Sequence, residues 1–242
     1  NILHPDCAFC IVLGKTDPQA SRHRQQSMIV VPIDTPGVEI VRDIPVFHGM
    51  HTGGHGEVVY NNVRVPASNL LGEEGDGFAI AQARLGPGRI HYGMRCIGMA
   101  ELALELMVAR CQERKAFGKY LHEHGMTAEQ IARSRMEIDQ ARFLVLHTAK
   151  VMDDVGTKAA RKEIAMIKIV ASELVCNVAD RAIQIHGAMG MSPDTPLAEL
   201  YTLARVMRIG DGPNEVHLNA IAKMEVRESN PLDALRYYTG PE

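Results

Sequence analysis

One carboxylate, Asp211, stands between two glycines near the end of the chain, in the stretch RIGDGPNEVH. A carboxylate presented on a turn could act as a base in proton transfer. Gly210 and Gly212 would let the backbone approach a ligand closely. The same residues, with Pro213 after them and helix-like sequence on both sides, are also typical of a helix N-cap. Composition alone favours the cap.

Two other groups have residue types that can bind metals. Cys7 and Cys10 form a C-x-x-C pair, but no second ligand pair with zinc-site spacing follows, so structural thiols are predicted. His48, His51 and His55 belong to a Gly-rich loop in which nothing fixes their geometry, so solvated histidines are expected. No metal site is predicted. Five cysteines, an odd number, are typical of reduced thiols in an intracellular protein.

The bulk composition excludes several classes of protein. Apolar residues make up 46% of the 242 residues and charged residues 23%, which is typical of a soluble globular protein. A net charge of -3 gives no indication of a nucleic-acid surface. No apolar run has the length of a membrane span, and the first residues do not resemble a signal peptide. An intracellular soluble protein is expected.

The chain changes its hydrophobic period once. Residues 1 to about 70 predict strands, because short apolar runs such as Phe9–Leu13 and Met28–Ile33 are bounded by turn residues. The segments GVEIVRDIPV and GEVVYNNVRVP continue this pattern, with alternation at Val58/Tyr60 and Val63/Val65. From about residue 73 the apolar residues follow helical spacing. The three stripes are Ile97, Ala100, Leu104, Met107 and Cys111; Ile131, Ile138, Val145 and Met152; and Ile164, Ile167, Ala171, Leu174, Val178, Ala182 and Ile185.

Strands followed by long helices predict an α+β fold with segregated domains rather than a Rossmann alternation. The expected architecture is a partial antiparallel β-domain over 1–70, an up-down helix bundle over 71–228 and a tail over 229–242. Thr195-Pro196 predicts an N-cap with proline in the first helical turn, and a last helix is expected over 214–228. The Gly-rich stretches LGEEGDGF and RLGPGRIH predict turns and helix starts, since neither has the Walker pattern.

Several motifs together resemble the flavin-dependent acyl-CoA dehydrogenase family. They are, in order, VRVPASNLLGEEGDGF, GPGRIHYGMRCIGMAELALE, ERKAFGK, AIQIHGAMG and RIGDGPNEVH, and they extend over nearly the whole chain. Details such as HPDC, RHRQQS, TPGV and DGPNEVH are most similar to acyl-CoA dehydrogenase family members ten and eleven and their bacterial relatives. Five ordered motifs are more specific than any one of them.

The resemblance implies a reaction of fatty acid β-oxidation, in the bacterial cytoplasm or, in a eukaryote, in the mitochondrion or peroxisome. An acyl-CoA thioester would lose its α proton to a carboxylate and its β hydride to N5 of FAD, giving a trans-2-enoyl-CoA. Electrons would pass to an electron-transferring flavoprotein, and the protein would be a homodimer or homotetramer. Two alternatives remain open. One is a superfamily oxidase, similar to acyl-CoA oxidases or nitroalkane oxidases, and the other is a non-catalytic helical oligomerisation module.

The resemblance also assigns roles to single residues. Asp211 aligns with the family's catalytic glutamate, and Arg114 would contact the flavin pyrophosphate of a neighbouring subunit. The remaining cofactor positions are Phe117, Gln184, Gly187, Gly190 and Gly212, and the substrate positions are Arg89 and Gly210. Without the resemblance, Arg114 would be interpreted as a solvated arginine and Gln184 as a polar residue before a cap glycine.

The sequence departs from the family's pattern at three points beside the base. Asp211 is one methylene shorter than glutamate, by ~1.5 Å of bond length. Pro213 replaces a usual threonine, so one hydroxyl and one N–H are lost, and Gly210 replaces a usual aromatic residue. The family's N-terminal helical domain and the first half of its β-domain have no counterpart here. The chain is therefore interpreted as a C-terminal portion, with poor catalysis expected from these 242 residues alone.

Overall fold

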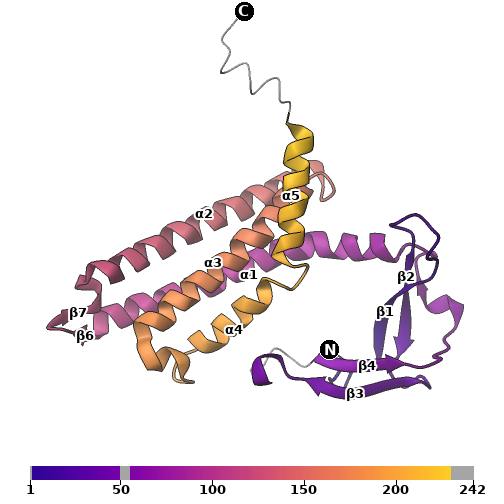
Figure 1. Cartoon of the computed structure of the whole chain (residues 1–242), viewed down its shortest axis with the longest axis horizontal. Coiled ribbons are helices and arrows are strands. Elements are labelled where there is room, and N and C mark those ends of the chain that lie inside the picture. Colours follow the sequence, from indigo (N-terminus) through magenta and orange to yellow (C-terminus); the bar gives the residue numbers. More distant parts are fainter. Residues whose placement is uncertain (1, 50–54, 230–242) are drawn as a thin grey trace, which may run out of the picture. The chain divides into compact units, whose positions relative to one another are not determined.

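A computed structural model describes residues 2–49 and 55–229 of the chain (Figure 1). The chain divides into two compact units, Asn1–Pro87 and Gly88–Glu242. The sequence-based division into domains after residue 70 stays a prediction. His51 of the Gly-rich loop and nearly all of the predicted tail lie outside the described residues.

The first unit contains the strands that the sequence predicted. A three-stranded antiparallel sheet has the order β1-β2-β5, with Val12 opposite Ile29, and β3 pairs with β4 in a separate antiparallel hairpin. Its elements are β1 (Phe9–Lys15), β2 (Gln26–Pro32), β3 (Val38–Ile44), the 3-10 helix η1 (Val46–Gly49), β4 (His55–Tyr60), the 3-10 helix η2 (Ala67–Asn69) and β5 (Leu70–Leu71).

One strand prediction was too long. The alternation through Val63 and Val65 suggested that the strand of GEVVYNNVRVP continues, but β4 ends at Tyr60. The chain turns at Asn62, whose φ of 50° lies in the left-handed region that asparagine tolerates better than most residues. Polar turn chemistry therefore overrides the alternation.

The second unit is a helix bundle, as predicted. In Figure 1 the long helices α1, α2 and α3 run along one another, and α3 packs against α2, α4 and α5. Its elements are α1 (Gly77–Glu113, which begins in the first unit), β6 (Lys115–Ala116), β7 (Lys119–Tyr120), the 3-10 helix η3 (Leu121–Glu123), α2 (Gly125–Val155), α3 (Arg161–His186), the 3-10 helix η4 (Gly187–Met191), α4 (Leu197–Met207) and α5 (Asn214–Glu228).

Two helix starts differ from the prediction. The stretch RLGPGRIH, predicted as a turn and helix start, lies inside α1. Pro87 is tolerated in the helix interior because its φ is helical, although it lacks one N–H donor. Helix α4 begins at Leu197, so Pro196 is its N-cap residue and not its first helical residue. Thr195 does not cap it, since its hydroxyl donates to the Met189 carbonyl at 3.4 Å.

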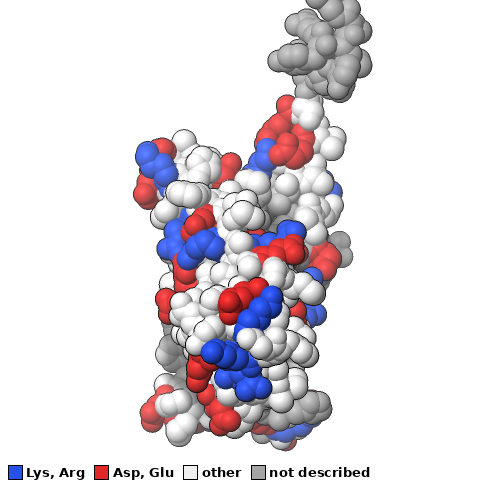
Figure 2. Space-filling model, turned by 90° about the vertical axis from the view of Figure 1, so that its left-hand side faces the viewer, with Lys and Arg blue, Asp and Glu red and all other residues white. Residues whose placement is uncertain are grey.

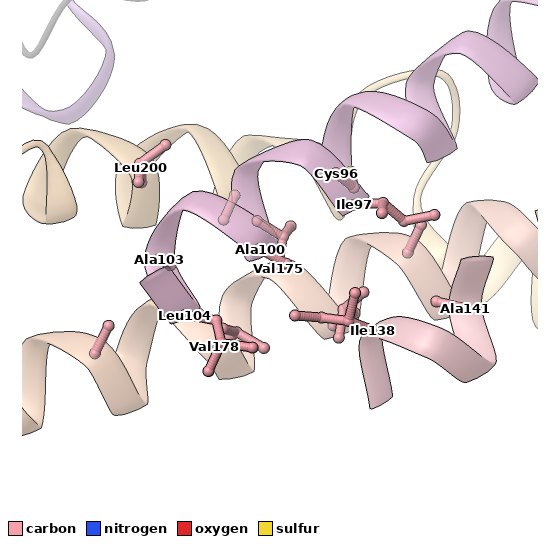
Figure 3. Packing of buried hydrophobic residues seen from close by; sticks show 14 of the residues in the cluster. Cys96, Ile97, Ala100, Ala103, Leu104, Ile138, Ala141, Val175, Val178 and Leu200 are labelled. Atoms are coloured by element: carbon pink, nitrogen blue, oxygen red, sulfur yellow. The ribbon is translucent and has the colours of Figure 1, made fainter. Parts of the chain in front are cut away.

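The three apolar stripes meet in the core of the bundle. Figure 3 shows Ile97 of α1, Ile138 of α2 and Val175 of α3 pointing into a common centre. Their exposed fractions are 2%, 0% and 0%. A buried aliphatic side chain contributes about 1.5–3 kcal/mol relative to an exposed one, so these stripes are what holds the helices in register.

The surface carries charges of both signs. On the face shown in Figure 2, blue and red side chains are interspersed and neither sign covers it.

Among the described helices, none is long and apolar enough to cross a membrane. Within the described residues, no three histidine, cysteine or acidic side chains are grouped so as to hold a metal ion. All five cysteines are free thiols.

Candidate functional site

Asp211 lies in the turn that joins α4 to α5. Its φ of 55° is in the left-handed region, which is uncommon for a residue other than glycine, and Gly212 follows with a φ of 103°. The turn is closed where the Asn214 N–H donates to the Arg208 carbonyl at 3.2 Å. Such backbone geometry persists only when the surroundings hold it in place.

The backbone carbonyl of Asp211 is held from two helices. Arg89 of α1 donates to it from Nη2 at 3.0 Å and from Nε at 3.3 Å. His217 of α5 places Nε2 3.3 Å from the same oxygen. Gly212 has no room for a side chain, because a Cβ there would lie 3.0 Å from His217 Nε2. These contacts fix the turn by its main chain.

The carboxylate of Asp211 takes no part in this bonding. Within the described part of the chain it forms neither a hydrogen bond nor an ion pair, and the residue is half-buried. It does not cap α5, whose N-cap residue is Pro213, with no side-chain hydrogen bond. The helix cap that composition favoured for Asp211 is therefore wrong, because its side chain does not cap α5.

Tyr92 of α1 occupies the space beside Gly210. Its hydroxyl donates to the Met207 carbonyl at 2.6 Å, and a Cβ on Gly210 would lie 3.3 Å from that hydroxyl. Burial raises the pKa of Tyr92, so the phenol keeps its proton. An aromatic side chain at position 210 would collide with Tyr92, which accounts for the glycine there.

A buried lysine lies on the other side of the turn. Lys168 of α3 is 0% exposed, and its ammonium donates to Asn214 Oδ1 at 2.8 Å. Burial lowers the pKa of Lys168 to about 8, while attraction to Asp211 opposes that shift. Sequence reasoning missed this residue. The signal was its position: Lys168 follows Ile167 directly on the apolar stripe of α3.

Burial lowers the pKa of both side chains that contact the Asp211 carbonyl. It lowers the pKa of His217, and repulsion from Arg89 and Lys168 adds to this effect. The hydrogen bond to the Asp211 carbonyl opposes this shift without reversing it, so the neutral imidazole is favoured. Burial also lowers the pKa of Arg89, against attraction to Asp211, but a guanidinium stays charged at any physiological pH.

A basic cavity opens beside these residues. Its volume is about 330 Å³. The lining residues are Arg89, Arg161, Ala165, His217, Ala220, Lys223, Met224 and Arg227. Four of these side chains are cationic and none is acidic, so the cavity suits an anionic group. Arg89 and His217 belong both to this cavity and to the contacts of the Asp211 carbonyl.

Apart from Gly212, which lies in the Asp211 turn, the predicted cofactor positions lie elsewhere on the bundle. Arg114 is exposed, directly after the last residue of α1. Phe117, with a φ of 53°, forms the turn of the β6–β7 hairpin together with Gly118, and its ring is 98% exposed. Within the described residues, the aromatic contact of this ring is an edge contact with His124, at 6.4 Å between ring centroids.

The remaining predicted cofactor positions lie where α3 ends. Gln184 is exposed in its last turn, and Gly187 follows with a φ of 66°. Gly190 is buried, and a Cβ there would lie 2.9 Å from the Ile183 backbone. The glycines are thus required by the backbone, while the Gln184 side chain is free to contact a ligand.

One chain does not bring the two sets of predicted residues together. Arg89 and Arg114 are 25 positions apart along α1, which corresponds to roughly 37 Å at 1.5 Å per residue. Figure 1 likewise shows β6 and β7 at one end of α1 and the start of α5 beside a distant part of the same helix. Arg114 and Arg89 therefore lie near different ends of the bundle in one chain.

Comparison with known proteins agrees with this picture. The family model described as "Acyl-CoA dehydrogenase, C-terminal domain" matches residues 75–225. "Probable acyl-CoA dehydrogenase FadE2" of Mycobacterium tuberculosis is 60% identical over 231 residues, which are 95% of this chain and 57% of that protein. "Acyl-CoA dehydrogenase family member 11" of Rattus norvegicus is 54% identical, over 93% of this chain and 29% of that protein.

A solved structure shows the same architecture. Butyryl-CoA dehydrogenase from Megasphaera elsdenii superposes with a TM-score of 0.80 and 32% identity, over 91% of this chain and 56% of that one. The chain thus spans little more than half the length of FadE2 and of this structure. The matched segment contains the bundle and the turn that carries Asp211. On this evidence the chain belongs to the acyl-CoA dehydrogenase family and contains its C-terminal domain.

Proposed function

We propose that this chain belongs to a flavin-dependent enzyme that dehydrogenates an acyl-CoA thioester to the trans-2-enoyl-CoA, with Asp211 as the base for the α proton. The observation that carries the proposal is a carboxylate, unpaired among the described residues, on a turn whose backbone is held by Arg89 and His217. A base needs such a carboxylate, fixed in position and free to accept a proton.

The basic cavity supports the choice of substrate. Coenzyme A ends in phosphate groups, and guanidinium and ammonium groups are the side chains that bind phosphate oxygens. Arg161, Lys223 and Arg227 line the cavity together with Arg89. Phosphates bound there would hold the coenzyme beside the turn, because Arg89 also contacts the Asp211 carbonyl, and the flexible pantetheine arm would have to carry the thioester to the carboxylate. Acyl-chain length is not encoded in these contacts.

The chain's own residues would divide the work as follows. Asp211 takes the α proton onto its carboxylate, and Arg89 with His217 keeps the backbone beneath it from moving. Tyr92 fills the space beside Gly210 and excludes water from it. A bound FAD supplies the hydride acceptor at N5. The short side chain of aspartate suffices if the strained turn brings it closer to the substrate.

The predicted cofactor positions fit an FAD shared between subunits. Arg114 and Gln184 are exposed, and Phe117 presents its ring almost entirely to solvent. An arginine suits a pyrophosphate, and an exposed ring suits a stacking or packing contact. Because roughly 37 Å of α1 separates Arg114 from Arg89, the flavin held by one chain would serve the Asp211 of another. A homodimer or homotetramer follows from this.

The proposal is tested with the full-length protein carrying its flavin. Anaerobic addition of saturated acyl-CoA thioesters of increasing chain length should bleach the flavin absorbance. Asp211→Asn removes the proton acceptor at constant size, so it should retain flavin and lose bleaching by on the order of a thousandfold or more. An Asp211→Asn variant that is reduced as fast as the parent protein would disprove the role of Asp211.

The electron acceptor separates the proposed dehydrogenase from an oxidase. Reoxidation of the reduced flavin by an electron-transferring flavoprotein, with slow reaction toward oxygen, is the expected result. Fast reoxidation by oxygen would identify an acyl-CoA oxidase instead. Bleaching by a nitroalkane and not by any acyl-CoA would identify an enzyme similar to nitroalkane oxidases. No bleaching by either substrate would point to a non-catalytic module.

A further inference from the structure

Lys168 has no role in the function proposed above. Its side chain is 0% exposed in the middle of α3. Burying an ammonium group costs several kcal/mol unless an anion compensates it. In the described part of the chain it forms no ion pair with a carboxylate, and its one hydrogen bond goes to a neutral oxygen, Asn214 Oδ1. A lysine of this kind is not explained by stability.

The position of Lys168 makes its charge costlier still. Asn214 is the first residue of α5, and the N-terminus of a helix carries a partial positive charge. Among nearby charges, Arg89 repels the ammonium, whereas Asp211 and Glu215 attract it. Asp211 stands three positions before Asn214, in the turn itself. Of the two carboxylates that attract Lys168, Asp211 belongs to the turn that Asn214 closes.

Asn214 connects the lysine to the turn. Its Oδ1 accepts from Lys168 at 2.8 Å and from Ser172 at 3.3 Å, and its Nδ2 donates to Glu173 Oε1 at 3.3 Å. Its backbone N–H closes the turn by donating to the Arg208 carbonyl at 3.2 Å. Three residues of α3 thus contact the Asn214 side chain, and the Asn214 backbone closes the C-terminal end of the turn.

We propose that Lys168 is a positioning residue for the α-proton transfer: it fixes the Asp211 turn through its hydrogen bond to Asn214. The proposal rests on the function proposed above. Without Lys168, the Asn214 side chain loses its shortest hydrogen bond, and the Asp211 turn is held less firmly from the α3 side. The carboxylate would then reach the α carbon less often in the correct geometry.

The test measures flavin reduction in the full-length flavin-loaded protein, mixed rapidly with an acyl-CoA and with the same thioester deuterated at the α carbon. The variants are Lys168→Met, Asn214→Ala and the double variant. Val178→Ala is the control, because it removes buried volume from α3 ten positions away, about 15 Å along the helix (Figure 3). Rates are expressed per bound flavin.

Lys168→Met should slow reduction by on the order of tenfold to a hundredfold and raise the α-deuterium isotope effect, since proton removal becomes slower. The double variant should be no slower than the slower single variant, because both act through one contact. Val178→Ala should keep the parent's rate and isotope effect. Should Lys168→Met fail to retain flavin, Asn214→Ala alone is expected to show the same slowing and the same rise.

Each contrary result has a distinct meaning. A parent protein that no acyl-CoA reduces contradicts the proposed function itself. If the parent is reduced and Lys168→Met matches its rate, or slows only as much as Val178→Ala with an unchanged isotope effect, Lys168 is purely structural. Fully additive effects of the two single variants would show that Lys168 does not act through Asn214.

Discussion

The residues around Asp211 carry opposite charges that are only partly neutralised. Lys168 is a buried cation without an ion pair in the described structure, and the Asp211 carboxylate is a half-buried anion without one. Arg89 adds a second cation, but it contacts the Asp211 main chain and not the carboxylate. Such an arrangement stores electrostatic energy that a purely structural site would avoid.

The burial of Lys168 predicts a pH dependence of stability. Its pKa is about 8 in the folded chain and 10.5 in the unfolded chain. Between pH 8 and pH 10.5 the unfolded chain binds more protons than the folded chain, so the free energy of unfolding rises with pH. Below pH 8 the cost of burying the charged lysine is fully present. The parent should therefore gain on the order of 1–3 kcal/mol relative to Lys168→Met between pH 8 and pH 10.

Denaturant unfolding of both proteins at several pH values measures this difference. The matched control is Lys150→Met, which removes an exposed lysine of α2. The difference between the parent and this control should change little over the same range. If the difference in stability between the parent and Lys168→Met is also flat, the ammonium is not destabilised by burial.

At this scale the sequence could identify some residues and not others. Asp211, Arg89 and Gly212 were found by resemblance, and the structure places all three at one turn. Tyr92 and Lys168 were missed, because each lies on a helix face whose neighbours become known only when helices pack. A lysine on an apolar stripe was visible in the sequence, but its partner, 46 positions away, was not.

The turn between α4 and α5 shows how elements position the site. Four helices contribute: α4 and α5 set its ends, α1 holds its carbonyl and α3 holds Asn214. The long helices were predictable, because their apolar stripes keep one period over many turns. The passage of α1 through Pro87 was not, since proline and glycine dominate the local signal while the helix is maintained on both sides.

Gly212→Ala tests the geometry of this turn. A φ of 103° and a contact of 3.0 Å to His217 Nε2 both oppose a Cβ, so a loss of about 1–3 kcal/mol in the free energy of unfolding is expected. Gly98→Ala is the control inside α1, where a Cβ meets nothing within 4 Å; it should stabilise by about 0.5–1 kcal/mol. Thermal unfolding of both variants compares them, and equal effects would contradict the strain at Gly212.

At the scale of the whole molecule, the separation of the predicted residues predicts complementation between subunits. Arg114→Ala alone should lose flavin, and Asp211→Asn alone should keep flavin but not be reduced. Oligomers assembled from both variants should regain activity, since Asp211 of one chain can meet the flavin held by Arg114 of the other. Oligomers mixed from Asp211→Asn and Asp211→Ala are the control and should stay inactive. Failure of the first mixture to recover would place both residues at a flavin within one chain.

Phe117 gives the proposed dependence on assembly a further consequence. Its ring is 98% exposed on a backbone with a φ of 53°, so a lone chain carries both an uncovered apolar tip and local strain. Exposed apolar surface is what cellular chaperones and proteases recognise in proteins that have not reached their final state. A subunit that stays alone would be removed sooner, and the abundance of the chain in a cell would follow its assembly as closely as its folding.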